Sequence, residues 1–315
     1  MSRAPFPFIV GCPRSGTTLL RAMFDSHPEM AIPPEAQFIV PMLRLRRRYE
    51  SSRGIRTDAL VAALKPAAQF PGWGLPEETV REAIGSSGGL PEALRRLHAA
   101  YAARDGKPRY GDKTPGAVLG IDVIAAAFPE ARFIHVFRDG RDVGLSLITQ
   151  SFGPSRIGRA ALWWRRRVRG GRRSGRRLGP TRYMEVRYET LVSDPEPIVR
   201  SLAEFAGLRF RDEMLRYHER GGPLRGVSSA AHARLHLPPT AGLRDWRSQM
   251  APGDVVQFEL LAGDLLEELG YERGSVSSMG TRLHARAKRA AWASRRAASR
   301  TRKVVGRLGR AMAAR

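Results

Sequence analysis

The stretch from residue 9 to residue 20, IVGCPRSGTTLL, constrains the fold more than any other part of the sequence. Its first residues form a short, partly β-branched apolar run that Gly11 ends, which predicts a buried strand at 8–10. From Thr17 the apolar residues recur at helical spacing, and Pro28 ends the pattern. A strand, a glycine-bounded loop and a helix therefore follow one another. The backbone N–H groups at the start of such a helix can hold a phosphate-like anion.

The loop lacks the lysine of a nucleoside triphosphate site. Gly11 and Gly16 have the spacing of the pattern G-x-x-x-x-G-K-[ST], but Thr17 stands at the lysine position and Arg14 lies inside the loop. A kinase or an ATPase needs that lysine together with Mg²⁺ to neutralise the β- and γ-phosphates. The sequence therefore disfavours a small-molecule kinase and favours a different phosphate-like ligand.

The rest of the chain alternates helices and strands. Residues 36–110 carry helical patterns interrupted by PGWG at 71–74 and SSGG at 86–89. Further elements are expected as follows: a helix at 116–128, a strand at 132–137, a helix at 141–150, a strand at 182–188, a helix at 195–206 and a helix from Pro252 to the cap Gly270. We predict one α/β domain at 1–274, with a mostly parallel sheet flanked by helices and a P-loop-like nucleotide site.

The net charge of +24 comes from two segments. Residues 155–187 hold 12 arginines and one acidic residue, and residues 275–315 hold 12 basic residues and no acidic one. The rest of the chain is nearly neutral, so the charge is not a property of the whole fold. We interpret 275–315 as a basic tail that contacts an anionic membrane, contacts nucleic acid or stays solvated. We expect the arginine cluster at 165–177 to be a flexible loop, which can also attract an anionic ligand.

Cysteine and histidine usage give no sign of a metal site. Cys12 is the only cysteine, which excludes an internal disulfide, and the seven histidines have no suitably spaced carboxylate or cysteine partners. The chain enters its first strand without a leader, and no apolar run approaches ~18 residues. We therefore expect no metal, no membrane span and a cytoplasmic location.

Five segments carry motifs in a fixed order: PRSGTTLLRAMFDSHP at 13–28, PPE at 33–35, GDKTP at 111–115, VFRDGRDVGLS at 136–146 and EVRYETLVSDP at 185–195. This order resembles the sulfotransferases that use 3′-phosphoadenosine 5′-phosphosulfate (PAPS), in particular their bacterial and tyrosylprotein-type branch. The first and fourth motifs are fairly specific alone. The resemblance implies metal-free, in-line transfer of a sulfonate from PAPS to an acceptor hydroxyl of a sugar, lipid, peptide or metabolite.

The resemblance assigns the loop to the 5′-phosphosulfate of PAPS. A sulfonate carries a single charge, so an arginine and backbone N–H groups can replace the lysine and metal of an NTPase. The expected contacts come from Arg14, Ser15, Gly16, Thr17 and Thr18. The alternative is a tight turn whose glycines serve only the backbone geometry.

The fourth motif supplies a second anion site. Arg138 follows an expected strand at the end where open α/β sheets bind ligands, and Ser146 lies in the next helix. In the family an Arg and a Ser at this spacing hold the 3′-phosphate. The alternative is a capped helix with Arg141 in a surface ion pair. Tyr188 and the loop at 228–239 are weaker candidates for contacts with the adenine or the 3′-phosphate.

The resemblance gives Glu35 and Lys113 catalytic roles. Glu35 is the expected general base, because the acceptor hydroxyl must lose its proton as the O–S bond forms. Lys113, together with Arg14, is expected to stabilise charge on the sulfonate and the leaving phosphate. The plainer alternatives are an ordinary loop glutamate and a solvated lysine before a proline.

A second class of function stays open at this point. The chain can be a non-catalytic protein that binds anions or nucleic acid on a decayed P-loop fold. Salt-sensitive binding of DNA would favour that class, whereas tight binding of 3′-phosphoadenosine 5′-phosphate (PAP) would oppose it. Because the excess of positive charge is confined to two segments, nucleic acid is the less favoured partner.

Overall fold

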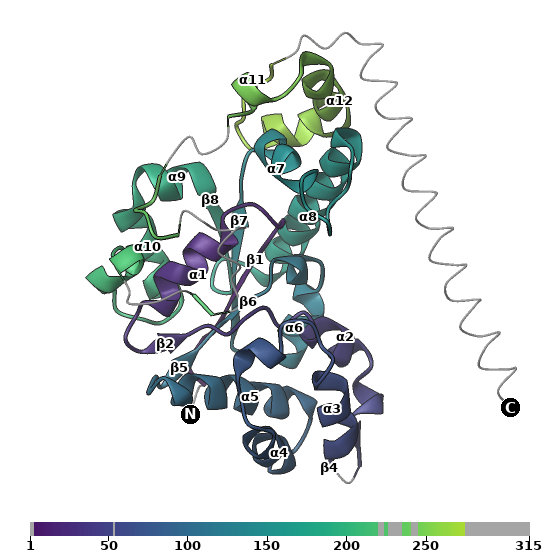
Figure 1. Cartoon of the computed structure of the whole chain (residues 1–315), viewed down its shortest axis with the longest axis vertical. Helices are drawn as coiled ribbons and strands as arrows, with labels where there is room; N and C mark the ends of the chain where they lie inside the picture. Colours follow the sequence, from purple (N-terminus) through teal and green to yellow (C-terminus); the bar gives the residue numbers. More distant parts are fainter. Residues whose placement is uncertain (1–2, 53, 220–223, 226–234, 241–244, 275–315) are drawn as a thin grey trace, which may run out of the picture. The chain divides into compact units, whose positions relative to one another are not determined.

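The computed structural model describes residues 3–52, 54–219, 224–225, 235–240 and 245–274 (Figure 1). Two compact units divide the chain, one formed by residues 1–138 with 166–243 and the other by 139–165 with 244–315. The basic tail at 275–315 lies outside the described residues. The domain boundary at 274 therefore stays a prediction.

The first unit is built on a four-stranded parallel sheet with the strand order β6-β1-β7-β8. Its strands are β6 (Asp112–Lys113), β1 (Phe6–Gly11), β7 (Ala131–Phe137) and β8 (Tyr183–Arg187). Ile9 of β1 lies opposite Lys113, and Gly11 lies opposite Val136 of β7. The predicted parallel sheet is thus confirmed. Because the strands run in one direction, their carboxyl ends meet at one edge.

Both faces of this sheet are buried. On one face, Ile9 and Ile134 pack with α1 (Thr17–Asp25), α9 (Tyr188–Ser193) and α10 (Pro195–Phe205). On the other face, Phe8 and Phe133 belong to the core that includes residues of the helix α5 (Leu90–Arg104). The view of Figure 1 places α1, α9 and α10 together beside the sheet. Alternate residues of each strand thus enter different cores, as expected for a covered parallel sheet.

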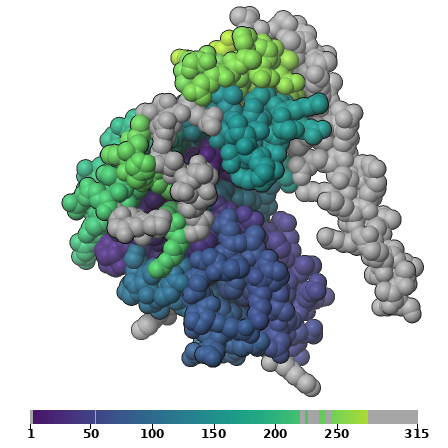
Figure 2. Space-filling view, viewed as in Figure 1, coloured from purple at the N-terminus to yellow at the C-terminus, as the bar shows by residue number. Residues whose placement is uncertain are grey.

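The expected helical region after residue 36 forms a packed body, drawn in blue in Figure 2. Its elements are α2 (Ile39–Arg44), η1 (Arg46–Arg48), α3 (Thr57–Leu64), η2 (Pro71–Trp73), α4 (Glu77–Gly85), α5 (Leu90–Arg104) and the short antiparallel pair β3 (Glu50–Ser51) and β4 (Gly54–Ile55). The PGWG stretch is a turn of 3₁₀ helix, and its Trp73 is fully buried. A separate parallel pair flanks this body in sequence. β2 (Met30–Ala31) precedes it, and β5 (Arg109–Tyr110) follows it.

The remaining short elements of the first unit differ slightly from expectation. The helix predicted at 116–128 is divided at Gly120 into η3 (Pro115–Leu119) and α6 (Ile121–Ala127). A Cβ at Gly120 would lie 2.5 Å from the Val40 side chain, so only glycine fits there. Two further 3₁₀ turns are η4 (Asp212–Met214) and η5 (Tyr217–Glu219).

The prediction of a flexible loop at 165–177 was wrong, because this segment belongs to the helix α8 (Ile157–Leu178). A Cβ at Gly171 would lie 2.6 Å from the His135 ring, and a Cβ at Gly175 would lie 2.2 Å from the Tyr183 ring. These glycines let α8 approach the sheet closely, while Arg173 is exposed. Glycine lowers intrinsic helix propensity, but tertiary packing overrides that preference here.

The second unit is helical in the part that the structure describes. It contains α7 (Gly140–Leu147), the start of α8, α11 (Trp246–Gln249) and α12 (Pro252–Glu268), with Gly270 beyond α12 at φ +74°. The predicted helix from Pro252 is thus confirmed. No helix of the described residues is both long and apolar enough to cross a membrane.

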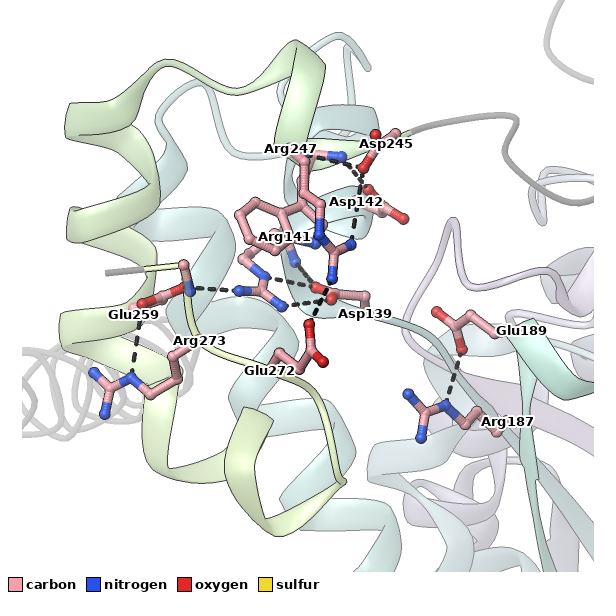
Figure 3. Close-up of polar contacts among 12 residues, drawn as sticks. Asp139, Arg141, Asp142, Arg187, Glu189, Asp245, Arg247, Glu259, Glu272 and Arg273 are labelled. Atoms are coloured by element: carbon pink, nitrogen blue, oxygen red, sulfur yellow. Dashed lines mark hydrogen bonds and ion pairs between the residues drawn. The ribbon is translucent and has the colours of Figure 1, made fainter. Parts of the chain in front are cut away.

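A buried arginine holds the second unit together. Figure 3 shows Arg141 between two carboxylates, Asp139 and Glu259, each 2.7 Å from a guanidinium nitrogen. The guanidinium carbon also lies 3.6 Å from the centre of the Trp246 ring. Arg141 is 1% exposed, so the alternative of a surface ion pair is wrong. Its charge is instead matched by two acids inside the unit.

We predict that Arg141→Met destabilises the protein by about 3 to 5 kcal/mol, because it removes the guanidinium that contacts the buried carboxylates of Asp139 and Glu259. Thermal and denaturant unfolding measure this. The matched control is Arg173→Met, since Arg173 is exposed and should change stability by less than about 0.5 kcal/mol. Equal stability of the two variants would contradict the assigned role of Arg141.

Candidate active site

The loop between β1 and α1 has the backbone of an anion-binding turn. The Ser15 N–H donates to the Cys12 carbonyl at 3.2 Å, and Arg14 lies in the left-handed region with φ +74°. Gly16 caps α1 at φ +95°, a conformation that favours glycine. Successive residues in such conformations turn their N–H groups toward one side. Thr17 and Thr18 then begin α1, and both are buried.

The Ser15 hydroxyl indicates that this loop is shaped for a ligand. Ser15 is fully buried, and its Oγ has no hydrogen-bond partner among the described residues. A buried hydroxyl without a partner costs free energy in the unliganded protein. An anion with several acceptor oxygens supplies the missing partner. The loop therefore fits the 5′-phosphosulfate group that the sequence predicts.

Tyr188 joins the loop to the end of β7. A Cβ at Gly16 would lie 2.3 Å from the Tyr188 ring, so the ring packs directly on the glycine backbone. The guanidinium carbon of Arg138 lies 4.6 Å from the centre of the same ring. Tyr188 thus lies between two of the predicted anion-binding elements. Gly16 is required here both for its backbone angle and for the space that the ring occupies.

Lys113 and Glu35 come together beside the loop. The Lys113 ammonium lies 2.7 Å from Glu35 Oε1 and 3.5 Å from Thr18 Oγ1. The Lys113 side chain is only 4% exposed, whereas that of Glu35 is 20% exposed. An incoming molecule can therefore reach the carboxylate, while the ammonium lies deeper, against the start of α1. The plainer alternative of a solvated lysine is wrong.

Burial lowers the pKa of Lys113 below the ordinary value of a lysine, and the adjacent Glu35 carboxylate only partly opposes this effect. Arg21 lowers the same pKa further by repulsion. The charge of Lys113 is thus held in an environment that penalises it. A bound anion would relieve that penalty.

Cys12, at the start of the loop, is fully buried. Burial raises the pKa of its thiol to about 12, which keeps it protonated near neutral pH. The charge of Arg167 of α8 acts on the same pKa in the opposite direction. Sequence reasoning missed Arg167 as a single residue, because the whole cluster was interpreted as a loop.

The GDKTP motif also holds the Glu35 segment in place. The Ala36 N–H donates to the Thr114 hydroxyl at 2.9 Å, one residue beyond Lys113. Gln37 donates from its side-chain amide to Glu35 Oε2 at 3.1 Å. β2 (Met30–Ala31) is the last strand before Glu35, which lies four residues beyond its end in a segment without regular secondary structure. The sequence could have indicated Gln37 as a partner of Glu35, because it is the next polar residue along the chain.

Other predicted site residues are less closely tied to this group. Arg138 directly follows β7, as expected, and is 8% exposed. Ser146 is buried in α7 of the second unit, and its pairing with Arg138 stays a prediction. Residues 228–234 of the candidate loop lie outside the described residues. In the described part of that loop, the Leu237 carbonyl accepts a hydrogen bond from Tyr217.

The fold and site together define an α/β protein in which a P-loop-like anion loop lies beside a buried lysine–carboxylate pair. The model of the sulfotransferase family matches residues 5–212. The chain therefore belongs to the sulfotransferase family, whose enzymes transfer a sulfonate group. This membership favours an enzyme over the alternative of a non-catalytic binding protein.

Relatives of this chain carry names of the same family. The chain is 28% identical over 278 residues to a protein-tyrosine sulfotransferase of Drosophila melanogaster, covering 85% of this chain and 52% of that protein. It is 28% identical over 280 residues to protein-tyrosine sulfotransferase 2 of Gallus gallus, covering 85% and 70%. The chain thus spans about half the length of the Drosophila protein.

The fold resembles two sulfotransferase domains. One comes from the Synechococcus olefin synthase, with a TM-score of 0.58 and 24% identity over 86% of this chain and 97% of that domain. The other comes from the curacin biosynthetic pathway, with a TM-score of 0.59 and 19% identity over 86% and 99%.

We predict opposite effects of Ser15→Ala on stability and on ligand binding. Removing a buried hydroxyl without a partner should leave the unliganded protein at least as stable as the wild type, with a gain of at most about 3 kcal/mol. The variant should bind PAP more weakly. Thermal unfolding and titration calorimetry with PAP measure the two effects. A variant that is less stable yet binds PAP normally would show that Ser15 serves the fold alone.

Proposed function

We propose that this protein transfers a sulfonate from PAPS to a hydroxyl group of its acceptor. One observation carries the proposal: the ammonium of Lys113 lies between the Glu35 carboxylate and the Thr18 hydroxyl at the start of α1. A cation and a base thus lie at the point where the anion loop ends. Family membership supports the reaction class.

PAPS supplies an activated sulfonate on its 5′-phosphate, and the acceptor oxygen bonds to sulfur as the bond from sulfur to the bridging oxygen breaks. Arg14 and the N–H groups of Ser15 to Thr18 bind the 5′-phosphosulfate. Lys113 stabilises negative charge on the leaving phosphate, and Arg14 contributes to the same task. Neither role needs a metal ion. The described residues contain no group of three or more His, Cys, Asp or Glu placed to hold one.

Glu35 takes the proton of the acceptor hydroxyl. Its carboxylate is the more exposed partner of the pair, so an acceptor can approach it without displacing Lys113 from α1. The ion pair with Lys113 orients Oε1, and Gln37 orients Oε2. A base must lie within hydrogen-bond reach of the proton that it removes, and these contacts fix the position from which Glu35 reaches it.

The acceptor that we propose is the phenolic hydroxyl of a tyrosine in a polypeptide. The relatives in Drosophila melanogaster and Gallus gallus carry the name protein-tyrosine sulfotransferase, which supports this choice. A phenol has a pKa of about 10 and loses its proton to a positioned carboxylate more readily than an aliphatic alcohol does.

Arg138, Ser146 and Tyr188 are proposed to bind the adenosine part of PAPS. The contacts of Tyr188 with Gly16 and Arg138 support a continuous binding surface from the loop to the end of β7. Arg138 then pairs with the 3′-phosphate. A cytoplasmic location and a contact of the 275–315 tail with an anionic membrane are further proposals, which rest on sequence alone.

The function predicts transfer of labelled sulfonate from PAPS to a tyrosine peptide, and no transfer to the same peptide with phenylalanine in place of tyrosine. Glu35→Gln keeps the size of the side chain but cannot take a proton, so we expect a fall in kcat of at least about 100-fold. PAP affinity, measured by calorimetry, should stay within a factor of about two. A Glu35→Gln variant with normal kcat would exclude Glu35 as the base.

We predict an alkaline limit to activity that Lys113 sets. Because burial lowers the pKa of Lys113, kcat/KM for PAPS should fall as pH rises through a value below the usual lysine range. Above that pH the ammonium loses the proton that carries its charge. In Lys113→Arg, the guanidinium keeps its charge, so the fall should move to higher pH although the rate is lower. An unchanged profile would assign the limit to another group.

A further inference from the structure

The segment that carries Glu35 is held by side chains instead of by a sheet. Residues 32–36, here called the strap, follow β2 and have no regular secondary structure. At its start, the Ile32 N–H donates to Asp25 Oδ1 at 2.9 Å, and Arg21 Nε donates to the Ile32 carbonyl at 3.0 Å. Both partners come from α1. The strap is therefore anchored to the helix that follows the anion loop.

Two side chains of the helical body hold the peptide groups on either side of Glu35. The indole N–H of Trp73 donates to the Pro34 carbonyl at 3.0 Å. The side-chain oxygen of Gln69 accepts from the Glu35 N–H at 3.1 Å. Gln69 and Trp73, here called the clamp, lie four residues apart: Gln69 precedes the 3₁₀ turn η2, and Trp73 ends it. One short segment thus contacts the backbone immediately before and at the proposed base.

Gln69 adopts a backbone conformation that its side chain disfavours. Its φ is +67°, in the left-handed region that glycine adopts without cost. A non-glycine residue there costs on the order of 1 kcal/mol, and such residues cluster at functional sites. Gln69 is exposed, so burial of its side chain does not offset this cost. Its side-chain oxygen accepts the hydrogen bond from the Glu35 N–H, a contact that glycine would not provide.

Trp73 is fixed by its surroundings. The residue is fully buried, and its ring contacts His98 at 4.8 Å and Tyr101 at 5.7 Å between centres. Phe38, two residues beyond the strap, packs on the same ring at 5.8 Å. The direction of the indole N–H is therefore set by the core. A buried tryptophan needs a partner for this group, and the Pro34 carbonyl provides it.

We propose that Gln69 and Trp73 are positioning residues that hold Glu35 in place during sulfonate transfer; this inference rests on the proposed function. Lys113 contacts both Glu35 and Thr18, so its bond to Glu35 weakens when Lys113 turns to the transferred group. The clamp acts on the backbone of Glu35 and does not depend on Lys113. It keeps the carboxylate aligned at that moment, when a displacement of about 1 Å can cost about 100-fold in rate.

The decisive variant is Gln69→Gly, which removes the hydrogen bond and also relieves the left-handed backbone. The melting temperature should therefore stay equal to that of the wild type or rise. We expect kcat with the tyrosine peptide to fall about 10-fold, while KM for PAPS and PAP affinity stay within about twofold. A wild-type kcat in Gln69→Gly would overturn the inference.

Trp73→Phe tests the other half of the clamp. It keeps a ring in the core but removes the N–H that contacts Pro34, so kcat should again fall about 10-fold at unchanged KM for PAPS. Trp164→Phe, a matched loss of volume at a fully buried tryptophan of the second unit, should lower the melting temperature with less than a twofold change in kcat. Equal losses of kcat in both variants would show a general packing effect.

Hydrogen exchange separates failure of this inference from failure of the proposed function. In the full-length protein, Gln69→Gly should speed amide exchange in a peptide covering the strap about 10-fold or more, with or without transferase activity. Faster exchange without any sulfonate transfer by the wild type would leave the clamp standing and refute the function. Unchanged exchange would refute the clamp itself.

Discussion

The parallel pairing of β1 with strands on both sides is the constraint on which the site depends. Its register places Lys113 beside Ile9 and places Val136 beside Gly11. A Cβ at Gly11 would lie 2.4 Å from the Val136 carbonyl oxygen, so the strand can turn into the anion loop only at a glycine. The loop, the lysine and Arg138 thus leave the sheet at one edge.

Some arginines of the first unit donate hydrogen bonds to backbone carbonyls instead of pairing with acidic side chains. Arg182 donates to the carbonyls of Ala125, Phe128 and Ala131, and Arg109 donates to the carbonyls of Pro5, Ala206 and Gly207. These arginines satisfy carbonyls at the ends of helices and strands, where the regular ladder stops. A large positive charge therefore does not by itself indicate a nucleic-acid ligand. Part of the arginine content serves internal hydrogen bonding.

The sequence predicted the parts of the site that are local in the chain. The anion loop follows from the spacing of Gly11 and Gly16, and the sheet follows from short apolar runs. Gln69 and Trp73 could not be predicted, because their contacts with the strap join residues 34 to 39 positions apart through the packing of a helical body. The alternative of a surface ion pair for Arg141 was wrong for the same reason, since its burial depends on Trp246 and Glu259.

The close approach of α8 to the sheet also has a consequence for how this helix can diverge between related chains. At Gly171 and Gly175 any side chain would overlap a ring of the sheet, so substitutions of these two glycines are disfavoured. Arg173 and Arg176 of the same helix are exposed, so they can exchange with lysine or glutamine at little cost. Among homologues, Gly171 and Gly175 should therefore vary less than Arg173 and Arg176.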